Sequence, residues 1–335
     1  MPDPRLDIPI RAPAATADDS VLPFEVAALD LRGRVARLGP AVNAILTARD
    51  YPAPVAKLLG EAIVLTVLLG SALKFEGRFI LQTKTDGPVR MLVADYRSPG
   101  RVRACAQFDA AAIDGTQPTS AELLGRGHLA MTIDQGQGMN RYQGVVALAG
   151  GNLEDAAHEY FLRSEQIPTR VRLAVAEELS ASAGGMRHRW RAGGMLLQFL
   201  PQKAERMRGP DLDPGDAPEG MSAPDVPEDE VWDEAWIEGR SLIATVEDIE
   251  LIDPELSSER LLYRLFHEHG VRVFRSSDVE AKCSCSRDGV SNMLKSFSQD
   301  ERGHMVQDSV ISVTCEFCNS KYVFAPAEVE IPAAG

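Results

Sequence analysis

The sequence predicts an α+β fold: an N-terminal core of antiparallel sheets and helices, a helical linker and a small C-terminal zinc-binding module. Strand-like stretches come in groups separated by short turn signals, which favours antiparallel pairing. Helical patterns lie between these groups, as in α+β folds. Four of the five cysteines lie near the C-terminus. The boundaries that follow are a core at 1–208, a linker at 209–280 and a metal module at 281–335.

The strands of the core are predicted from alternating apolar residues bounded by turn residues. The turn Asp86-Gly87-Pro88 separates the first two strands, and a Gly-rich stretch separates the fourth from the fifth. The predicted strands are Arg78–Thr85, Val89–Asp95, Arg101–Phe108, His128–Ile133, Tyr142–Leu148, Arg170–Ala176 and Gly193–Leu200.

Two helices are predicted in the core. The stretch Val55–Leu73 follows two prolines and is apolar on most of its surface, which is typical of a buried helix. Asn152 is a suitable N-cap for a second helix, Leu153–Ser164. We expect Met1–Ser20 to be loose and ordered structure to begin within Phe24–Asp30.

The linker begins with a change of composition. Gly209–Glu230 is rich in proline and acidic residues, which predicts a solvated, flexible insertion. Two amphipathic helical patterns follow, Val231–Leu251 and Pro254–Glu268, and then a short strand, Val271–Phe274. These helices need an apolar surface to cover.

The composition excludes several classes of protein. A net charge of −14 argues against a nucleic-acid binder, which would need clustered Lys and Arg. The longest apolar run, Ala62–Leu73, is too short to span a bilayer, and no secretory signal is visible, so no membrane partner is expected. We expect a cytoplasmic protein. Reduced thiols in that compartment favour metal ligands or redox sensors over permanent disulfides.

The C-terminal cysteines form two close pairs, Cys283-Ser284-Cys285 and Cys315-Glu316-Phe317-Cys318. Two thiol pairs separated by a loop can surround one soft metal ion, and zinc is the usual metal of a four-thiolate site. Such a site is coordinatively closed, so the Zn²⁺ would be structural rather than hydrolytic.

The first pair is unusual because zinc ribbons ordinarily use two C-x-x-C motifs. Neighbouring thiols can bind one metal or oxidise to each other. Three interpretations therefore remain open at this point: a constitutive zinc module for protein or nucleic-acid contact, a redox-responsive module, and a thiol oxidoreductase.

No catalytic constellation appears, so the protein is not expected to be an enzyme. The sequence lacks a phosphate-binding G-x-x-x-x-G-K-[ST] motif, which predicts no use of ATP. His267 and His269 are expected at a solvated helix end, and His304 would find no vacancy beside four thiols. Cys105 lies in a strand pattern, far in sequence from the other four cysteines, and is expected to be a small buried residue with no part in their chemistry.

Several stretches together resemble the heat shock protein 33 family of redox-regulated holdase chaperones. The resemblance is collinear from about Asp30 to Phe324, and the long acidic stretch departs from more compact members. The segments that carry it are Cys283-Ser284-Cys285-Ser286-Arg287, Cys315-Glu316-Phe317-Cys318, Thr85-Asp86-Gly87-Pro88-Val89, Ser164–Thr169, Gly194–Gln198 and Leu262–Glu268.

The resemblance implies an ATP-independent chaperone that is inactive when reduced and zinc-bound. It implies metal ligation by Cys283, Cys285, Cys315 and Cys318. Oxidants would then form the disulfides Cys283–Cys285 and Cys315–Cys318, release zinc and unfold the module and linker. The activated form would dimerise and hold unfolding client proteins.

Overall fold

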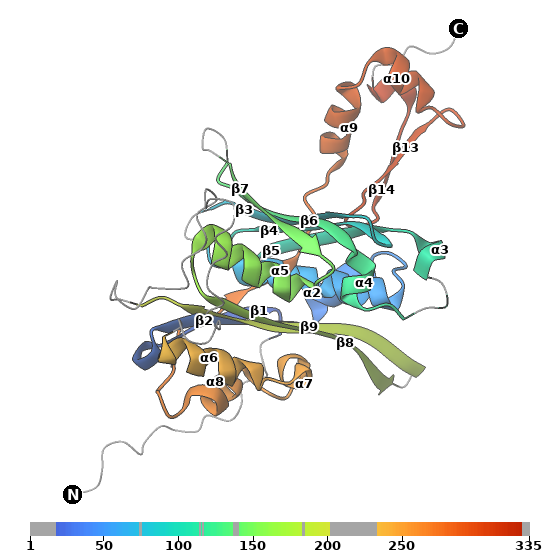
Figure 1. Ribbon diagram of the computed structural model, residues 1–335. Coiled ribbons are helices and arrows are strands. Elements are labelled where there is room, and N and C mark those ends of the chain that lie inside the picture. Colours follow the sequence, from blue (N-terminus) through green and yellow to red (C-terminus); the bar gives the residue numbers. More distant parts are fainter. Residues whose placement is uncertain are drawn as a thin grey trace, which may run out of the picture.

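The computed structural model describes residues 18–73, 76–113, 115, 117–136, 141–182, 185–201 and 233–329. Most of the predicted loose N-terminus and the whole of the acidic stretch Gly209–Glu230 lie outside these residues. The described chain is an α+β protein with two six-stranded sheets and a small two-stranded sheet (Figure 1). The predicted fold class is therefore confirmed.

The first sheet has the strand order β10-β1-β2-β9-β8, and β11 also pairs with β1. All of its pairings are antiparallel. Its strands are β1 (Ser20–Val26), β2 (Leu31–Leu38), β8 (Thr169–Ser182), β9 (Gly185–Phe199), β10 (Arg272–Val273) and β11 (Ser277–Asp278).

The second sheet has the strand order β12-β5-β4-β3-β6-β7. It is antiparallel except at its edge, where β12 runs parallel to β5. Its strands are β3 (Arg78–Thr85), β4 (Val89–Arg97), β5 (Arg101–Phe108), β6 (Arg126–Asp134), β7 (Tyr142–Ala149) and β12 (Glu280–Ala281).

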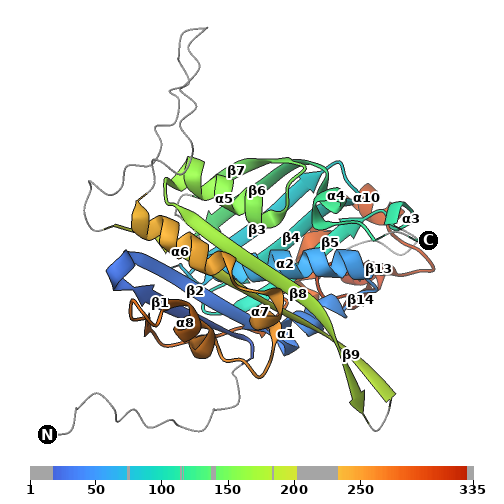
Figure 2. The same ribbon diagram turned by 60° about the horizontal axis from the view of Figure 1, so that its bottom comes forward.

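Helix α2 (Ala53–Gly70) lies between the two sheets (Figure 1) and beneath β8 and β9 in Figure 2. It is long and apolar enough to cross a membrane, but 78% of it is buried within the protein. Its side chains Leu58, Ile63 and Leu65 are fully buried in one cluster with residues of both sheets. The predicted buried helix is confirmed, and α2 forms the centre of the core.

The other helices fall into three groups. Helices α1, α4 and α5 lie beside α2 and belong to the same buried cluster between the sheets (Figure 1), α6 to α8 lie on the outer face of the first sheet, and α9 and α10 belong to the part that projects at the C-terminal end. Thr119 and Asn152 cap α4 and α5 with reciprocal bonds to the third helical residue, so the predicted Asn152 cap is confirmed. The α-helices other than α2 are α1 (Pro40–Leu46), α3 (Ala110–Ile113), α4 (Ser120–Leu124), α5 (Leu153–Tyr160), α6 (Glu234–Ala244), α7 (Asp248–Ile252), α8 (Ser258–Phe266), α9 (Arg287–Lys295) and α10 (Gln299–His304).

The linker helices α6, α7 and α8 cover the outer face of the first sheet (Figure 2). The ring centroids of Phe24 in the sheet and Phe266 in α8 are 5.8 Å apart, and those of Phe199 in the sheet and Trp236 in α6 are 6.3 Å apart. A second buried cluster therefore lies on this side, and the first sheet is apolar on both faces. The amphipathic linker thus has the apolar surface that its sequence required.

Arg37 fixes α7 to the sheet. Its guanidinium is 3% exposed and donates to the carbonyl oxygens of Glu250 (2.7 Å), Asp253 (2.9 Å) and Leu251 (3.3 Å). These carbonyls form the C-terminal end of the helix, where a cation is favourable. A single buried charge therefore satisfies three backbone acceptors of the linker.

Several predicted boundaries were wrong. Within the described residues, the predicted helix Val231–Leu251 is two helices, and the second begins where the Glu250 carboxylate accepts a hydrogen bond from the Glu247 amide (3.0 Å). The predicted helix Leu153–Ser164 has nearly the predicted extent, but it is an α-helix only to Tyr160 and continues as a π turn, Phe161–Glu165. Strands β8 and β9 are longer than predicted, and β2 and α1 were not predicted at all.

Candidate metal centre

The C-terminal residues form a small module that projects from the second sheet (Figure 1). It contains α9, α10 and the hairpin of β13 (Ile311–Thr314) and β14 (Lys321–Phe324), followed by a 3-10 turn, Pro326–Val329. Its buried apolar cluster has only four members: Leu294, Ile311, Phe324 and Val329. So small a core is marginal for independent folding.

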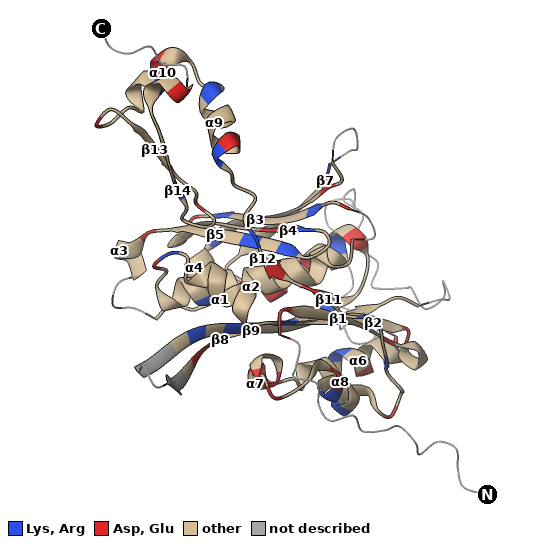
Figure 3. Cartoon of the chain, turned by 180° about the vertical axis from the view of Figure 1, so that it is seen from behind, with Lys and Arg blue, Asp and Glu red and all other residues tan. Residues whose placement is uncertain are grey.

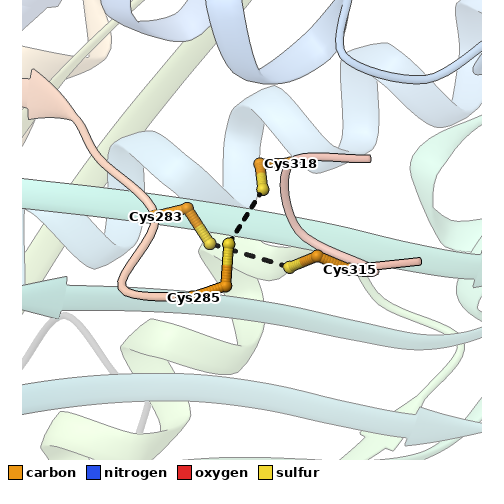
Figure 4. A group of neighbouring side chains, drawn as sticks. All are labelled: Cys283, Cys285, Cys315 and Cys318. Carbon is orange, nitrogen blue, oxygen red and sulfur yellow. Dashed lines mark hydrogen bonds between the residues drawn. The ribbon is translucent and has the colours of Figure 1, made fainter. Parts of the chain in front are cut away.

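The four C-terminal cysteines meet at the base of this module (Figure 4). Their sulfur atoms all lie within 4.8 Å of one another. The Sγ atoms of Cys283 and Cys315 are 3.7 Å apart, and those of Cys285 and Cys318 are 3.3 Å apart. The structure therefore brings together all four predicted ligands from segments that are distant in sequence.

Local backbone structure positions each pair. Cys315 to Ser320 form the tight turn between β13 and β14, closed by bonds from Asn319 N to Cys315 O and from Cys315 N to Ser320 O, both 2.9 Å. Asn319 has a left-handed φ of 59°, which asparagine tolerates better than most residues. The other pair lies between β12 and α9, whose first turn is capped by Ser286.

Polar groups surround the sulfur atoms. The Tyr322 hydroxyl donates to Cys285 Sγ (3.1 Å), Arg103 Nη1 donates to Cys283 Sγ (3.9 Å), and Ser320 Oγ lies 3.2 Å from Cys318 Sγ. The bond to Cys285 raises the pKa of Tyr322 to about 12, so the phenol stays protonated as a donor. Tyr322 and Arg103 donate to sulfur and so favour thiolates over thiols at Cys285 and Cys283.

The thiols titrate as a group. Burial raises the pKa of Cys285 to about 12. Burial also opposes ionisation of Cys318, but its bonds with Ser320 and with Cys285 outweigh this and lower its pKa to about 6. A thiolate at Cys318 can thus share a proton with the thiol of Cys285. A divalent cation in place of that proton would allow all four thiols to ionise.

The chemistry of the donor set fits zinc. Four sulfur ligands suit a tetrahedral soft or borderline metal ion and leave no open position. This is the single group of three or more His, Cys, Asp or Glu ligand atoms that could hold a metal within the part of the chain described. His304 is exposed and bonds the Asp300 carbonyl instead, while His267 and His269 lie near α8.

The module is attached to the core directly at this centre. Strand β12 pairs with β5, and the amide of Lys282 donates to Val102 O (3.0 Å). The turn between Cys315 and Cys318 also contacts the core. Arg49 donates to Glu316 O (3.0 Å), and the Arg103 guanidinium lies 4.1 Å from the centroid of the Phe317 ring. The segments that carry the four cysteines are therefore also the part of the module that contacts the core.

Cys105 is buried, as predicted, at 3% exposure. It lies on β5 between Arg103 and Gln107, and these two contact Phe317 and Glu316 of the module. Because residues two apart on a strand share a face, Cys105 lies beneath the Cys315–Cys318 turn. Burial first, and then Glu316, raises its pKa to about 12, so it is an inert thiol while covered.

Sequence reasoning missed the groups that the core contributes to this centre. The places of Arg103 and Cys105 could be assigned only once β5 was known to pair with β12, and Tyr322, which the module itself contributes, only once β14 was known to pair with β13. The alternation of Arg103, Cys105 and Gln107 was the available signal, but it does not say which face the module covers.

Comparison with known proteins agrees with this architecture. The family model described as Hsp33 protein matches residues 19–325. A 33 kDa chaperonin of Caulobacter vibrioides is 43% identical over 315 residues, covering 92% of this chain and 95% of the relative. A 33 kDa chaperonin of Pseudomonas aeruginosa is 35% identical over 308 residues, covering 91% of each chain.

The fold has a solved counterpart as well. The crystal structure of the 33 kDa chaperonin (heat shock protein 33 homolog) from Thermotoga maritima superposes with a TM-score of 0.69 at 20% identity, covering 93% of this chain and 97% of that one. With the family match and the two relatives, which extend over nearly the whole sequence, the chain belongs to the Hsp33 protein family.

Proposed function

We propose that this protein is a redox-regulated, ATP-independent holdase chaperone. Reduced and zinc-bound, it is inactive; oxidation of the metal ligands unfolds the C-terminal module and the linker, and the exposed surface binds unfolding proteins. One observation carries the proposal: the four cysteine sulfurs meet within 4.8 Å where a module with a very small core joins the body of a chaperone-family fold.

Zinc would be held by Cys283, Cys285, Cys315 and Cys318, and when bound it would keep the four thiols ionised and fold the module. A structural four-cysteine site contributes roughly 10–16 kcal/mol of apparent binding energy at neutral pH. This equals the stability of a whole domain, typically about 5–15 kcal/mol. Loss of the ligands would therefore unfold the module.

The redox step converts two thiols and one peroxide into a disulfide and two molecules of water. A thiolate attacks the peroxide to form a sulfenic acid, and the neighbouring thiol displaces its hydroxyl as water. We propose the pairs Cys283–Cys285 and Cys315–Cys318. The shortest sulfur distances in the folded module join Cys283 to Cys315 and Cys285 to Cys318, so disulfide mapping by mass spectrometry is needed to decide the pairing.

Unfolding of the module would loosen the linker, because 272–281 lead from the linker helices to the cysteines along the edges of both sheets. Isolated helices as short as α6, α7 and α8 are marginal in water. Their departure would expose the apolar outer face of the first sheet, which includes Leu22, Phe24, Val35, Met195 and Leu197. We propose this face as the surface that holds clients.

The remaining expectations are parts of the same proposal. The activated form is a homodimer, the protein acts in the cytoplasm, and nucleic acid, membranes and ATP take no part. A holdase needs no nucleotide because it prevents aggregation by binding alone. Its partners are unfolding proteins, which present apolar segments.

The test follows aggregation of a heat-unfolding protein by light scattering, with reduced or peroxide-treated chaperone and with a chelating dye reporting zinc. Only the oxidised protein should suppress aggregation, zinc release should precede suppression, and ATP should have no effect. Cys105→Ser is the control, because it removes a buried thiol outside the metal site and should keep the activation.

Two alternatives give different results in this test. A constitutive zinc module would bind its partner when reduced and lose binding on oxidation. A thiol oxidoreductase would show reductase or isomerase turnover. Either result would reject the holdase proposal.

A further inference from the structure

A small basic cavity lies beside the metal centre, where the second sheet meets the Cys283 segment. Its volume is about 110 Å³. Charged side chains form most of its lining, and Cys283 and Ser284 complete it. They are Arg78, Asp95, Arg97, Arg101, Arg103 and Lys282. Figure 3 shows blue (Lys and Arg) segments on the strands next to β12.

Three of the arginines stand side by side on adjacent strands. Arg78 of β3 is the register partner of Arg97 of β4, and Arg97 is the register partner of Arg101 of β5. Register partners share a face of the sheet, and like charges directly opposite each other are destabilising. The repulsion among these three arginines therefore destabilises the folded sheet, so the row is not explained by a contribution to stability.

The carboxylates nearby leave this charge largely unbalanced. Asp95 binds both Arg78 (2.6 Å) and Arg103 (2.8 Å) and is almost fully buried. Two flanking acids are already paired: Asp134, abreast of Arg78, with Arg141 (3.2 Å), and Glu280, abreast of Arg101, with Lys282 (3.7 Å). Within the described residues, Arg97 and Arg101 have no ion-pair partner.

The negative metal centre does not account for all of these cations. Four thiolates around a divalent ion carry a net charge of −2, so some positive charge is expected nearby. However, Arg103 is the guanidinium that bonds a cysteine sulfur, at 3.9 Å from Cys283. The Arg78, Arg97 and Arg101 row lines a cavity instead.

We propose that this cavity binds a small oxyanion of the phosphate class. Guanidinium groups bind such anions with paired, charge-assisted hydrogen bonds. The volume is far below the roughly 300–1,000 Å³ of pockets for organic ligands, which favours an inorganic anion. The ligand would relieve the repulsion among Arg78, Arg97 and Arg101.

The cavity has walls from both parts of the protein, so its ligand couples them. The sheet supplies four arginines and Asp95, whereas Lys282, Cys283 and Ser284 belong to the segment that carries the metal ligands. A ligand of the complete cavity stabilises the docked module by linkage, because undocking removes one wall. The bound oxyanion therefore keeps the Cys283 segment docked on the second sheet. This inference rests on the docked geometry and does not depend on chaperone activity.

The test uses the reduced, zinc-loaded full chain and inorganic phosphate, with chloride at matched ionic strength as the reference. Titration calorimetry should show saturable binding at one site, and hydrogen exchange in 280–285 should slow. Arg97→Gln and Arg101→Gln should each weaken binding about tenfold or more, because each removes a charge-assisted contact. Lys84→Gln and Arg126→Gln are the matched controls, since both are exposed on the same face of this sheet outside the cavity, and they should bind normally.

The thermal midpoint separates a binding site from a structural cluster. In chloride, Arg97→Gln should be as stable as the unsubstituted chain or more stable, because one repulsive neighbour is gone. Phosphate should raise the midpoint of the unsubstituted chain and leave that of Arg97→Gln unchanged. Equal effects of chloride and phosphate, or equal losses in the Lys84→Gln control, would overturn the proposal, whereas equal binding of sulfate would support its oxyanion chemistry.

Discussion

The core and the C-terminal module are built on opposite principles. Helix α2 alone buries 14 residues between two sheets, whereas the described part of the module, which ends at Val329, has a buried apolar cluster of four. The core is therefore held by apolar burial, which is insensitive to oxidants. The module has a small buried core, and we propose that its folding depends on a metal ion held by the four sulfur atoms at its base.

The linker stands between these extremes. Its helices bury Trp236, Leu261 and Phe266, but against the first sheet rather than against one another. These helices are therefore stabilised by packing against the core surface, and hydrogen bonds from Arg37 also stabilise the position of α7. A protein that is to unfold in part needs such a gradient of stability, with the core at one end and the metal module at the other.

Metal removal should produce the largest difference in stability between the core and the C-terminal module. A chelator under reducing conditions takes away roughly 10–16 kcal/mol of folding energy from the module and none from the core. Hydrogen exchange should then become fast in β13 and β14 while α2 stays protected. Protection of the hairpin without metal would show that its own core suffices.

Matched truncations on the two sides should have different consequences. Leu65→Ala in α2 should lower the free energy of unfolding of the core by about 2–5 kcal/mol, as for other buried leucines, and leave zinc affinity unchanged. Ile311→Ala should leave the core melting midpoint unchanged and weaken zinc binding about 30-fold or more, because binding drives folding there. Competition with a zinc chelator and thermal denaturation measure the two effects.

Arg37→Met should destabilise the linker helices and leave the stability of the core and of the metal module unchanged. It leaves one buried and two partly buried carbonyls without their donor, which costs on the order of 3 kcal/mol. Hydrogen exchange in α7 and α8 should speed up while zinc binding stays normal. The control is Arg32→Met on the same strand, where the side chain is 62% exposed and its loss should have no effect. An unchanged linker in Arg37→Met would show that apolar packing alone holds it.

The two regions should also respond oppositely to pH. Burial raises the pKa of Glu61 in α2 to about 7, although Ser120 bonds its carboxylate. The folded core thus holds a proton that the unfolded chain releases near pH 4.5, so stability from this group falls as pH rises from about 4.5 to 7. Glu61→Gln should be more stable than the unsubstituted chain by about 1–3 kcal/mol at pH 8 and equal to it at pH 4.

Zinc affinity of the module should rise over the same interval, because its ligands must be deprotonated. Denaturant titrations at several pH values measure the first effect, and chelator competition measures the second. A Glu61→Gln variant with the same pH dependence as the unsubstituted chain would contradict the role given to this carboxyl group.

The sequence was sufficient for features with strong local signals. Alternation and turn residues predicted β3 and β5 with their observed bounds, and the apolar surface of α2 predicted its burial. The convergence of Cys283, Cys285, Cys315 and Cys318 was predictable because two close thiol pairs separated by a loop are typical of a single metal site.

What could not be predicted depends on pairing between distant segments. Strand β2 alternates arginines with small and apolar residues, and it is recognisable only beside β1 and β9. The N-cap at Glu247 divides a helical pattern that looked continuous. The row of Arg78, Arg97 and Arg101 exists only through strand register, since no spacing in the sequence connects the three.

The most direct test of the redox switch is hydrogen exchange by mass spectrometry on one sample, before and after peroxide, with aggregation suppression measured in parallel. We expect the oxidised protein to lose protection in β13, β14 and α6 to α8, to keep it in α2 and β3 to β5, and to suppress aggregation. Suppression by a protein whose module and linker remain protected would contradict the account, and so would complete unfolding of these elements without any suppression.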